Sequence, residues 1–198
     1  MINNCLPVSF YSKPAVIVAR ELLGMHLIRS LDGQQIEGII LEAEAYQGEE
    51  DQACHARSGY TPRTSIMYGT PGRAYIYFTY GMHWMLNCVC DQEGTPAAVL
   101  IRAIHLIEGT DFVRMRRPKA DPGNWCNGPA KLCQALSIDG HLNGSNLCDP
   151  QTGIWIEWGK PFPNESVVIS PRVGLGNVPE PWHSMPWRFK GTISADLA

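Results

Sequence analysis

The sequence predicts an α+β fold: a single domain over residues 1–198, with a mixed, largely antiparallel β-sheet, a protruding β-hairpin and several flanking helices. Three observations lead to this prediction. Residues 35–46 alternate with a period of two, two aromatic segments flank a Tyr–Gly turn, and several short segments carry the proline and glycine signals of helix ends. No repeat, low-complexity tract or long linker divides the chain.

Helices are predicted where proline or glycine marks a helix end and the apolar residues between have helical spacing. The candidate segments are residues 14–23, 111–117 and 129–136. In the first segment, Pro14 follows Ser12 and Lys13, one of which is expected near the N-cap, and Gly24 ends the apolar run. The third segment has Pro129 at its first position, where the missing N–H is harmless.

Strands are predicted where aromatic or β-branched residues alternate. The segments are residues 35–46, 73–80, 83–90, 97–106, 153–158 and 165–170, and the second and third form the hairpin around Tyr80 and Gly81. In the first strand the alternation separates two faces. One face carries Ile39, Leu41, Ala43 and Ala45, and the other carries Ile40, Glu42, Glu44 and Tyr46.

Composition excludes several classes of protein. Hydrophobic residues make up 44% and charged residues 18%, which favours a packed core over disorder. No apolar run approaches the roughly 20 residues of a membrane helix, so no membrane partner is expected. Residues 1–7 lack a secretory pattern, and seven cysteines cannot all pair, so we expect reduced thiols in a cytosolic or nuclear protein. With a net charge of −3, nucleic-acid binding would need a locally basic face.

A carboxylate beside an aromatic ring marks the first candidate site. Glu44 and Tyr46 share a strand face on which aliphatic residues are expected if that face simply meets the core. A general base in a partly desolvated pocket has these features. The alternative is an edge of the strand that faces solvent.

A metal site is the less favoured interpretation of the cysteines and histidines. Cys88 and Cys90 lie on one strand face, but no second pair follows at the spacing of a zinc site. His55, His83 and His105 are far apart in the sequence. Buried structural thiols explain the cysteines better, so we expect no metal.

Tyrosines and arginines gather around the predicted hairpin. Tyr75 and Tyr77 share a strand face, whereas Tyr80 lies at the tip, where it is exposed for insertion unless it simply packs. The nearby arginines are Arg57, Arg63 and Arg73, an arrangement that suits phosphates beside stacking surfaces. A second run, Arg114, Arg116, Arg117 and Lys119, is better explained as a solvated helix end.

Taken together, these segments resemble the alkyladenine (3-methyladenine) DNA glycosylase family. The matching strings occur in order and cover residues 10–189 without a large gap. They are Glu-Ala-Glu-Ala-Tyr-Gln-Gly from Glu42, residues 51–57, Thr61-Pro-Arg, Tyr75-Ile-Tyr-Phe-Thr-Tyr-Gly-Met-His-Trp, Asn87, Leu100-Ile-Arg-Ala, Gly128-Pro-Ala-Lys-Leu-Cys-Gln-Ala-Leu, Pro171-Arg-Val-Gly and Pro186-Trp-Arg-Phe. The short N-terminus resembles the bacterial members.

The resemblance implies catalytic roles for three residues. Glu44 matches the general base that activates water for attack on the sugar C1′. Arg102 and the backbone carbonyl of Val173 match groups that hold this water. No metal and no diffusible cofactor is implied.

The resemblance also implies contacts with base and DNA. Tyr46, His55 and Tyr77 match the pocket that sandwiches a flipped base, and Asn87 matches the residue that crowds the 2-amino group of guanine. Tyr80 matches the wedge that fills the gap in the duplex. The further DNA-binding residues expected from the matching motifs are Met82, Leu100, Thr61, Arg63 and Lys131.

The expected activity is the excision of alkylated or deaminated purines from double-stranded DNA. The lesions are 3-methyladenine, 7-methylguanine, hypoxanthine and ethenoadenine, and neutral ones need protonation as they depart. No lysine lies at a motif position suited to a Schiff base, so a monofunctional enzyme that leaves an abasic site is expected. We expect a monomer in the bacterial cytoplasm, associated with the nucleoid while it acts on DNA.

Two departures and two alternatives stay open. Thr64 stands where the family commonly has Asn, which affects local loop contacts but not the expected reaction. Residues 177–184 diverge, so contacts from that loop are not carried over. The first alternative is a non-catalytic DNA-lesion or RNA-binding module. The second is a metal-dependent hydrolase that uses His55 and the cysteines.

Overall fold

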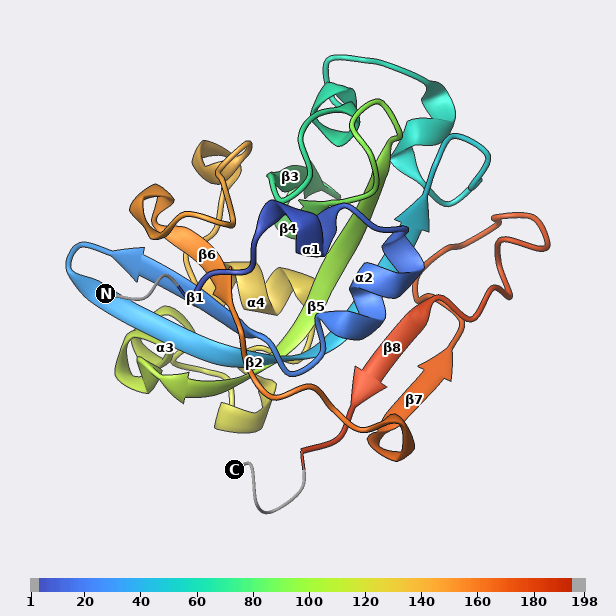
Figure 1. Cartoon of the computed structure of the whole chain (residues 1–198). Helices are drawn as coiled ribbons and strands as arrows, with labels where there is room; N and C mark the ends of the chain where they lie inside the picture. Colours follow the sequence, from blue (N-terminus) through green and yellow to red (C-terminus); the bar gives the residue numbers. More distant parts are fainter. Residues whose placement is uncertain (1–3, 194–198) are drawn as a thin grey trace.

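The computed structural model describes residues 4–193, and an eight-stranded sheet forms the centre of the fold (Figure 1). The strands are β1 (His26–Leu31), β2 (Gln34–Gln47), β3 (Ala74–Thr79), β4 (His83–Val89), β5 (Ala97–Glu108), β6 (Ile154–Glu157), β7 (Val167–Ser170) and β8 (Arg188–Gly191). The main order is β3-β4-β5-β2-β1-β6, and each pairing between described strands is antiparallel. The predicted α+β fold with a largely antiparallel sheet is confirmed.

The long strand β2 organises the sheet because it has two neighbours along one edge. Residues 34–39 pair with β1, and residues 42–44 pair with β8, which also pairs with β7. Along its other edge, β2 pairs with β5 over residues 37–47. The β7–β8 pair therefore lies beside the second half of β2, as Figure 1 shows.

Short helices complete the fold. The α-helices are α1 (Val8–Tyr11), α2 (Ala15–Glu21), α3 (Thr110–Arg116) and α4 (Pro129–Ala135). The 3₁₀ turns are η1 (His55–Ser58), η2 (Ser65–Tyr68), η3 (Pro122–Asn124), η4 (Gly140–Leu142), η5 (Pro150–Thr152) and η6 (Asn164–Ser166). The three predicted helices are confirmed: α2 and α4 are slightly shorter than predicted, and α3 is shifted by one residue. Helix α1 was not predicted because four residues carry no helical period.

The N-terminus of α2 lies next to Ser12 and Lys13 as predicted, but neither residue is its N-cap. Pro14 is the N-cap, and no side chain caps the helix. Ser12 instead donates its hydroxyl to the carbonyl of Val8 at the end of α1, and Lys13 forms an ion pair with Glu21 at 2.6 Å. The hydroxyl of Ser12 is therefore engaged at the end of α1, and Lys13 pairs with the last residue of α2.

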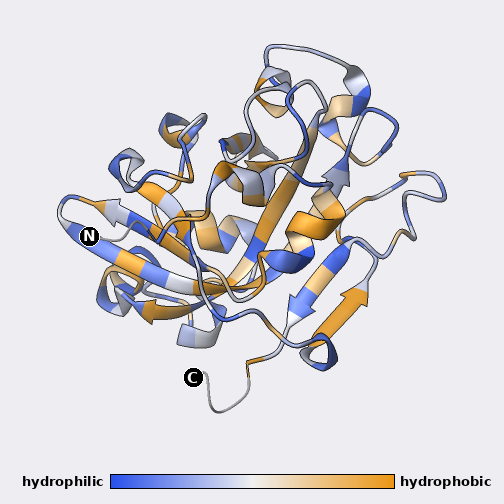
Figure 2. Cartoon of the chain, in the orientation of Figure 1, coloured by the Kyte–Doolittle hydropathy of each residue, from blue (hydrophilic) through white to orange (hydrophobic). Residues whose placement is uncertain are grey.

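The core lies where α2 and α4 cover the central strands. In Figure 1, α2 crosses in front of β2 and β5, whereas α4 is drawn behind them. Figure 2 shows that apolar residues gather on α2 and along the central strands, while many of the connecting loops are hydrophilic. Within residues 4–193, no helix is both long enough and apolar enough to cross a membrane.

The predicted hairpin is confirmed as β3 and β4, with Thr79 opposite His83. At its tip, Tyr80 and Gly81 have φ angles of 53° and 67°, and the amide of Met82 donates to the carbonyl of Thr79. Two successive residues with positive φ are typical of the tight turns that match the twist of paired strands. The turn directs the chain back and leaves the tip exposed.

The second half of β2 does not alternate between a buried face and a solvent-facing one, although Glu44 and Tyr46 share a face as predicted. The pairing with β5 shifts register around Leu41, and Ala43, Glu44 and Ala45 are all buried. A bulge of this kind adds a residue to one strand and bends it. Glu44 therefore does not lie on a solvent-facing edge, and that alternative is wrong.

The last two predicted strands are shorter in the structure. β6 covers four residues of the predicted segment 153–158, and β7 covers the last four of 165–170. The residues before β7 form η6, which follows Pro163. The proline and the turn that follows it delay the start of the strand.

Candidate active site

A cavity of about 510 Å³ lies between β2, β5, the β3–β4 hairpin, η1 and the loop at residues 173–178. This volume falls within the range of roughly 300–1,000 Å³ that is typical of small-molecule sites. Eight of the predicted site residues contribute to its wall: Tyr46, His55, Tyr77, Tyr80, Asn87, Leu100, Arg102 and Val173. The structure thus brings together residues that are more than 120 positions apart in the sequence.

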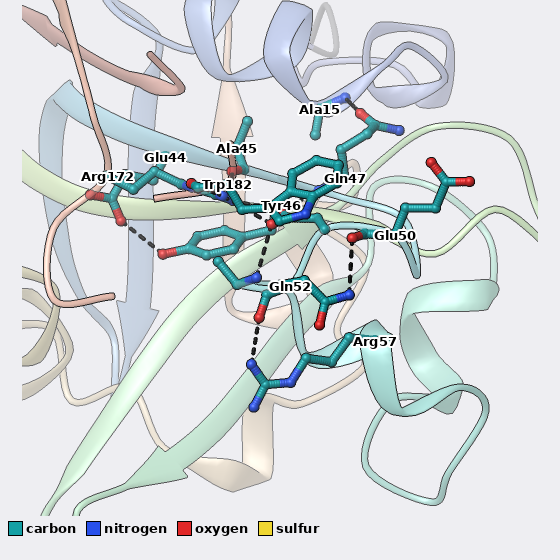
Figure 3. A network of polar contacts seen from close by, with 12 residues as sticks. Ala15, Glu44, Ala45, Tyr46, Gln47, Glu50, Gln52, Arg57, Arg172 and Trp182 are labelled. Carbon is teal, nitrogen blue, oxygen red and sulfur yellow. Dashed lines mark hydrogen bonds and ion pairs between the residues drawn. The ribbon is translucent and has the colours of Figure 1, made fainter. Parts of the chain in front are cut away.

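Glu44 lies behind this wall and is fully buried. Its Oε1 accepts the backbone N–H of Val173 at 2.7 Å, and its Oε2 accepts the hydroxyl of Tyr46 at 3.0 Å and the Nη1 of Arg102 at 3.1 Å. Figure 3 shows the Tyr46 hydroxyl turned toward the Glu44 carboxylate. All three donors belong to residues that line the cavity, so the carboxylate is adjacent to it.

Opposing forces act on the pKa of Glu44. Burial disfavours the charged carboxylate and raises the pKa above its ordinary value near 4.5. The positive charge of Arg102, the Val173 N–H and the Tyr46 hydroxyl lower it, and Glu42 raises it slightly. Burial prevails, so this carboxyl group holds its proton more tightly than an exposed glutamate does.

A second bulge aims Arg102 at the carboxylates. Glu42 pairs with Ala103 and Ala43 pairs with Ile101, so Arg102 on β5 has no residue directly opposite on β2. Its Nε donates to Glu42 at 2.8 Å while its Nη1 contacts Glu44. Bulges often redirect a side chain beside an active site, and here the redirected arginine bridges two carboxylates.

Aromatic rings form the cavity wall opposite Glu44. The rings of His55 and Tyr77 lie 4.5 Å apart between centroids at an interplanar angle of 76°, and those of Tyr75 and Tyr77 lie 5.4 Å apart. The predicted shared face of Tyr75 and Tyr77 is therefore confirmed. Together with Tyr46, these rings leave a space bounded by aromatic groups on more than one side.

The protonation state of His55 follows from its neighbours. Burial, and then the nearby charges of Arg63 and Arg57, lower the pKa of His55 to about 4. The Nε2 lies 3.4 Å from the Arg63 guanidinium, which only donates, and Nδ1 lies 2.8 Å from the Tyr75 hydroxyl. A neutral imidazole with its proton on Nδ1 satisfies both contacts.

Asn87 and Leu100 line the inner part of the same cavity. Asn87 is buried, and its Nδ2 donates to the carbonyl of Tyr75 at 3.0 Å. This bond fixes the orientation of the amide on β4. Leu100 pairs with both Glu44 on β2 and Asn87 on β4, which places it between the carboxylate and the amide.

Of the remaining predicted DNA contacts, Tyr80 stands at the rim of the cavity, and Met82, Arg63 and Lys131 lie outside its wall. Tyr80 borders the cavity with 79% of its surface exposed, and Met82 beside it is 66% exposed. Arg63 stacks over the ring of Tyr77, with 5.1 Å between its Cζ and the ring centroid. Lys131 is partly exposed on α4 and donates to the side chain of Asn127.

Thr61 is held in place by the residue that departs from the family pattern. Thr64 is buried, and its Oγ1 lies 2.8 Å from the Oγ1 of Thr61 and donates to the carbonyl of Gly59 at 2.8 Å. A hydroxyl at this position therefore cross-links the loop between η1 and η2. Thr64 keeps the loop compact with contacts of its own.

The second basic run joins two helices. Arg116 donates to the carbonyl of Ala135 at 3.1 Å, and Arg117 contacts the side chain of Gln134. Arg114 lies over the ring of Trp125. These contacts support the interpretation of this run as a helix end, since two of its arginines connect α3 with α4.

Six of the seven cysteines are buried in the packed interior, and Cys148 is half-buried. Burial raises the pKa of the thiols of Cys54, Cys88, Cys126 and Cys133 to about 12, so they stay protonated at neutral pH. Metal ligation requires the thiolate. Within the described part of the chain, no three His, Cys, Asp or Glu side chains form a group that could hold a metal ion.

Sequence reasoning missed the ion pair between Arg172 and Asp51. Both side chains are fully buried, and they meet 121 positions apart in the sequence. Arg172 directly precedes Val173, and its guanidinium lies 4.8 Å from the centroid of the Tyr46 ring. The Pro171-Arg-Val-Gly string marked the segment, but nothing local in the sequence indicates the partner.

The chain is similar to known DNA glycosylases over nearly its whole length. The family model described as methylpurine-DNA glycosylase matches residues 9–194. A relative from Myxococcus xanthus, named "Putative 3-methyladenine DNA glycosylase", is 43% identical over 94% of this chain and 89% of its own length. Relatives with the same name from Chlorobaculum parvum and Wolbachia pipientis are 44% and 41% identical, over 98% and 100% of this chain and 90% and 95% of their own lengths.

Proposed function

The chain belongs to the methylpurine-DNA glycosylase family, and from this premise we propose that it is a monofunctional glycosylase of base excision repair. Its substrate would be double-stranded DNA that contains alkylated or deaminated purines. It would hydrolyse the N-glycosidic bond and leave an abasic site. One observation carries the proposal: a fully buried carboxylate, Glu44, lies behind a cavity with aromatic walls that is large enough to admit a nucleobase.

The substrate base must leave the duplex before it can react. Extrusion costs a few kcal/mol, and an aromatic side chain inserted into the stack offsets part of this cost. Tyr80 is exposed at the tip of the hairpin and borders the cavity, so it is positioned to enter the stack while the base enters the site. Met82 would contact the duplex beside it.

Inside the cavity, Tyr46, His55 and Tyr77 would hold the base between their rings. A purine alkylated at N3 or N7 is cationic and is attracted to the faces of tyrosine rings. Asn87, fixed by its bond to Tyr75, would crowd the 2-amino group of an undamaged guanine. Neutral lesions such as hypoxanthine and ethenoadenine bind less tightly on this basis and need a proton as they depart.

Glu44 would act as the general base. A carboxylate offers about four acceptor positions, and three are taken by Val173, Tyr46 and Arg102, which leaves one for a water molecule. Loss of the base creates positive charge on the sugar, which the nearby carboxylate stabilises while it takes a proton from the water. Arg102 and the Val173 carbonyl would orient this water.

The remaining parts of the proposal concern the whole protein. Residues 1–198 would form one glycosylase domain, since the family match spans 9–194 and a common core joins α1, α2 and α4 to the sheet. Thr61, Arg63 and Lys131 would contact the DNA outside the cavity. The enzyme would work as a monomer in the bacterial cytoplasm, on the DNA of the nucleoid.

Release of bases from damaged DNA tests the proposal. The purified protein is incubated with methylated DNA and with duplexes that contain hypoxanthine or ethenoadenine, and the free bases are separated and counted. We expect release of 3-methyladenine and 7-methylguanine, with strand breaks only after alkali treatment. Tight binding without release would favour a lesion-binding module, and release that is lost on chelation and restored by zinc would favour a metal-dependent hydrolase.

A further inference from the structure

Arg172 is a buried cation to which the proposed mechanism assigns no task. Its side chain and that of Asp51 have no exposed surface, and they form a two-pronged ion pair with distances of 2.5 and 2.9 Å. The same guanidinium donates to the carbonyls of Ala45 and Trp182, each at 3.0 Å. One side chain therefore joins β2, the segment before η1 and the loop that precedes β8.

These contacts lie next to the groups proposed to act on the substrate. Ala45 stands between Glu44 and Tyr46 on β2, and the three residues appear with Arg172 and Trp182 in Figure 3. The guanidinium is stacked between two rings, 4.8 Å from the Tyr46 centroid and 5.0 Å from the Trp187 centroid. Arg172 thus contacts a ring of the base pocket directly and precedes the amide that binds Glu44.

Asp51 links the Arg172 contacts to the part of the cavity wall that His55 forms. It accepts the backbone N–H groups of Gln47 at 3.2 Å and Ala53 at 3.0 Å, in addition to the two bonds from Arg172. The turn that it organises leads directly into η1, which begins at His55. The ion pair therefore fixes the end of β2 and the start of η1 relative to each other.

We propose that Arg172, paired with Asp51, is a positioning residue that fixes the Val173 amide, the Tyr46 ring and the start of η1 in their places around Glu44. This inference rests on the proposed function, because it assigns Arg172 to the site that would hydrolyse the glycosidic bond. Arg172 touches neither base nor water in this scheme. It acts through Val173 and Tyr46.

The energetics favour positioning over simple stabilisation. Removing two charges from water is costly, and a buried ion pair is often no more stable than apolar residues of similar volume. The Nε of Arg172 is also buried without a hydrogen-bond partner among the described residues, which adds to the cost. Directional bonds from one rigid guanidinium, in contrast, define the relative placement of three segments.

Lysine at position 172 isolates geometry from charge. Arg172→Lys keeps the positive charge near Tyr46 but cannot make both bonds to Asp51 and both carbonyl bonds at once. The Val173 amide should then bind Glu44 less firmly. The variant substitutes none of the other groups that face Glu44: Arg102 from β5, Glu42 and Tyr46 from β2, Tyr77 from β3, and Arg188 from β8, which pairs with it in the sheet.

The test measures the pKa of Glu44 directly by NMR titration of ¹³C-labelled glutamate carboxyl groups, with Glu44→Gln used to assign the signal. Loss of one backbone hydrogen bond to a carboxylate should raise its pKa by about one unit. We expect this rise in Arg172→Lys, together with a single-turnover excision rate at least about tenfold lower. In the pH–rate profile, the fall in rate on the acidic side should begin at a higher pH than in the wild type. The affinity for lesion DNA should change less than the rate.

Arg29→Lys is the matched control. Arg29 is also buried and donates to backbone carbonyls, those of Ser30 and Gly153, but it lies on β1 away from the cavity. We expect this variant to lose thermal stability without a change in the pKa of Glu44. Trp187→Leu removes one stacking ring and keeps the ion pair, so it should shift the pKa in the same direction by a smaller amount, even where Arg172→Lys folds poorly.

An unchanged pKa of Glu44 in Arg172→Lys, or in Trp187→Leu if only that variant folds, would overturn the inference and leave Arg172 with a structural role. A shift in Arg29→Lys as large as in Arg172→Lys would also overturn it. The titration needs no substrate, so its outcome is independent of base release. If the wild-type protein releases bases and the titration fails, the positioning role is wrong and the proposed function stands.

Discussion

Glu44 is fully buried and accepts three hydrogen bonds, whereas Tyr80, which borders the cavity that those donors line, is 79% exposed at a hairpin tip. The Glu44 side is enclosed by charged and polar groups that fix one another. The tip presents Tyr80 and Met82 to solvent, and a Cβ added at Gly81 would meet nothing within 4 Å. The Glu44 side is thus held in place by contacts within the protein. The hairpin tip has exposed side chains that could contact another molecule.

This difference separates two tasks. Fixed dipoles and charges lower a barrier because they need no reorganisation during the reaction, which suits the Glu44 side to bond cleavage. An exposed aromatic group on a turn with positive φ suits insertion into a stack, where burial against bases compensates for its exposure. The predictions below test whether cleavage and extrusion divide in this way.

The largest effect should come from Glu44→Gln. The amide keeps the shape of the side chain but cannot take a proton from water, so single-turnover excision should fall by about a hundred- to ten-thousandfold or more. Lesion-DNA affinity should stay within about tenfold, or 1.4 kcal/mol. Excision at near wild-type rate by this variant would remove the distinction between the two regions.

The next largest effect should come from Tyr80→Ala. Base–aromatic stacking is worth roughly 1–3 kcal/mol, so the equilibrium for base flipping should fall by about ten- to a hundredfold. The loss should be greatest for stably paired lesions and smaller for mismatched ones, where extrusion costs less. The measurement is single-turnover excision of one lesion opposite several bases.

Tyr77→Ala is the control for Tyr80→Ala because Tyr77 lies in the cavity wall, within β3. Its loss should depend on how the extruded base stacks and not on the opposing base. An equal loss for Tyr80→Ala across all opposing bases would count against the wedge. Tyr80 would then be better explained as a packing residue.

A further prediction concerns stability and pH on the enclosed side. The pKa of His55 is lowered from 6.5 to about 4, so the unfolded chain takes up this proton first as the pH falls. Stability should therefore decline from about pH 6.5 and the contribution of His55 should level off below about pH 4. The free energy of unfolding is measured with denaturant across this pH range, relative to the value of the same protein at pH 8. It should decline less for His55→Gln than for the wild type. Parallel curves for variant and wild type would contradict the lowered pKa.

The smallest effect concerns basic residues on the surface outside the cavity. Binding of lesion DNA should weaken as salt rises despite the net charge of −3, because phosphate contacts release counterions whatever the total charge. Lys131→Gln should reduce the slope of log affinity against log salt by about one. Lys119→Gln, in the run that extends α3 away from the cavity, is the control and should leave the slope unchanged. An affinity that is independent of salt would exclude a basic DNA-binding face.

Elements that depend on neighbours in the sequence were predictable. The hairpin follows from aromatic alternation on both sides of Tyr80 and Gly81, and α4 follows from Pro129 at its first position. The same alternation placed Tyr75 and Tyr77 on one face. These features depend on backbone geometry within a few residues, so one segment contains the whole signal.

The enclosed side of the site depends on contacts that no segment contains. The bulges at Leu41 and Arg102 arise from the pairing of β2 with β5, and three consecutive residues that follow on β2, Ala43, Glu44 and Ala45, are buried. The sequence identified Glu44 as a candidate, but its burial depends on a loop that arrives 129 positions later. Only the tertiary structure decides such burial, because desolvation and pairing are set by whatever chain surrounds a group.

The ion pair of Arg172 and Asp51 is the clearest example of this limit. Taken alone, an arginine or an aspartate is expected at the protein surface, and each would be costly to bury without the other. Local sequence determined that β2 is a strand, that Tyr80 stands at a turn and that Glu44 lies near Tyr46. Only the tertiary structure determined that Arg172 and Asp51 are buried as a pair. Their pairing depends on the distance between two segments that are far apart in the sequence and meet only when the chain folds.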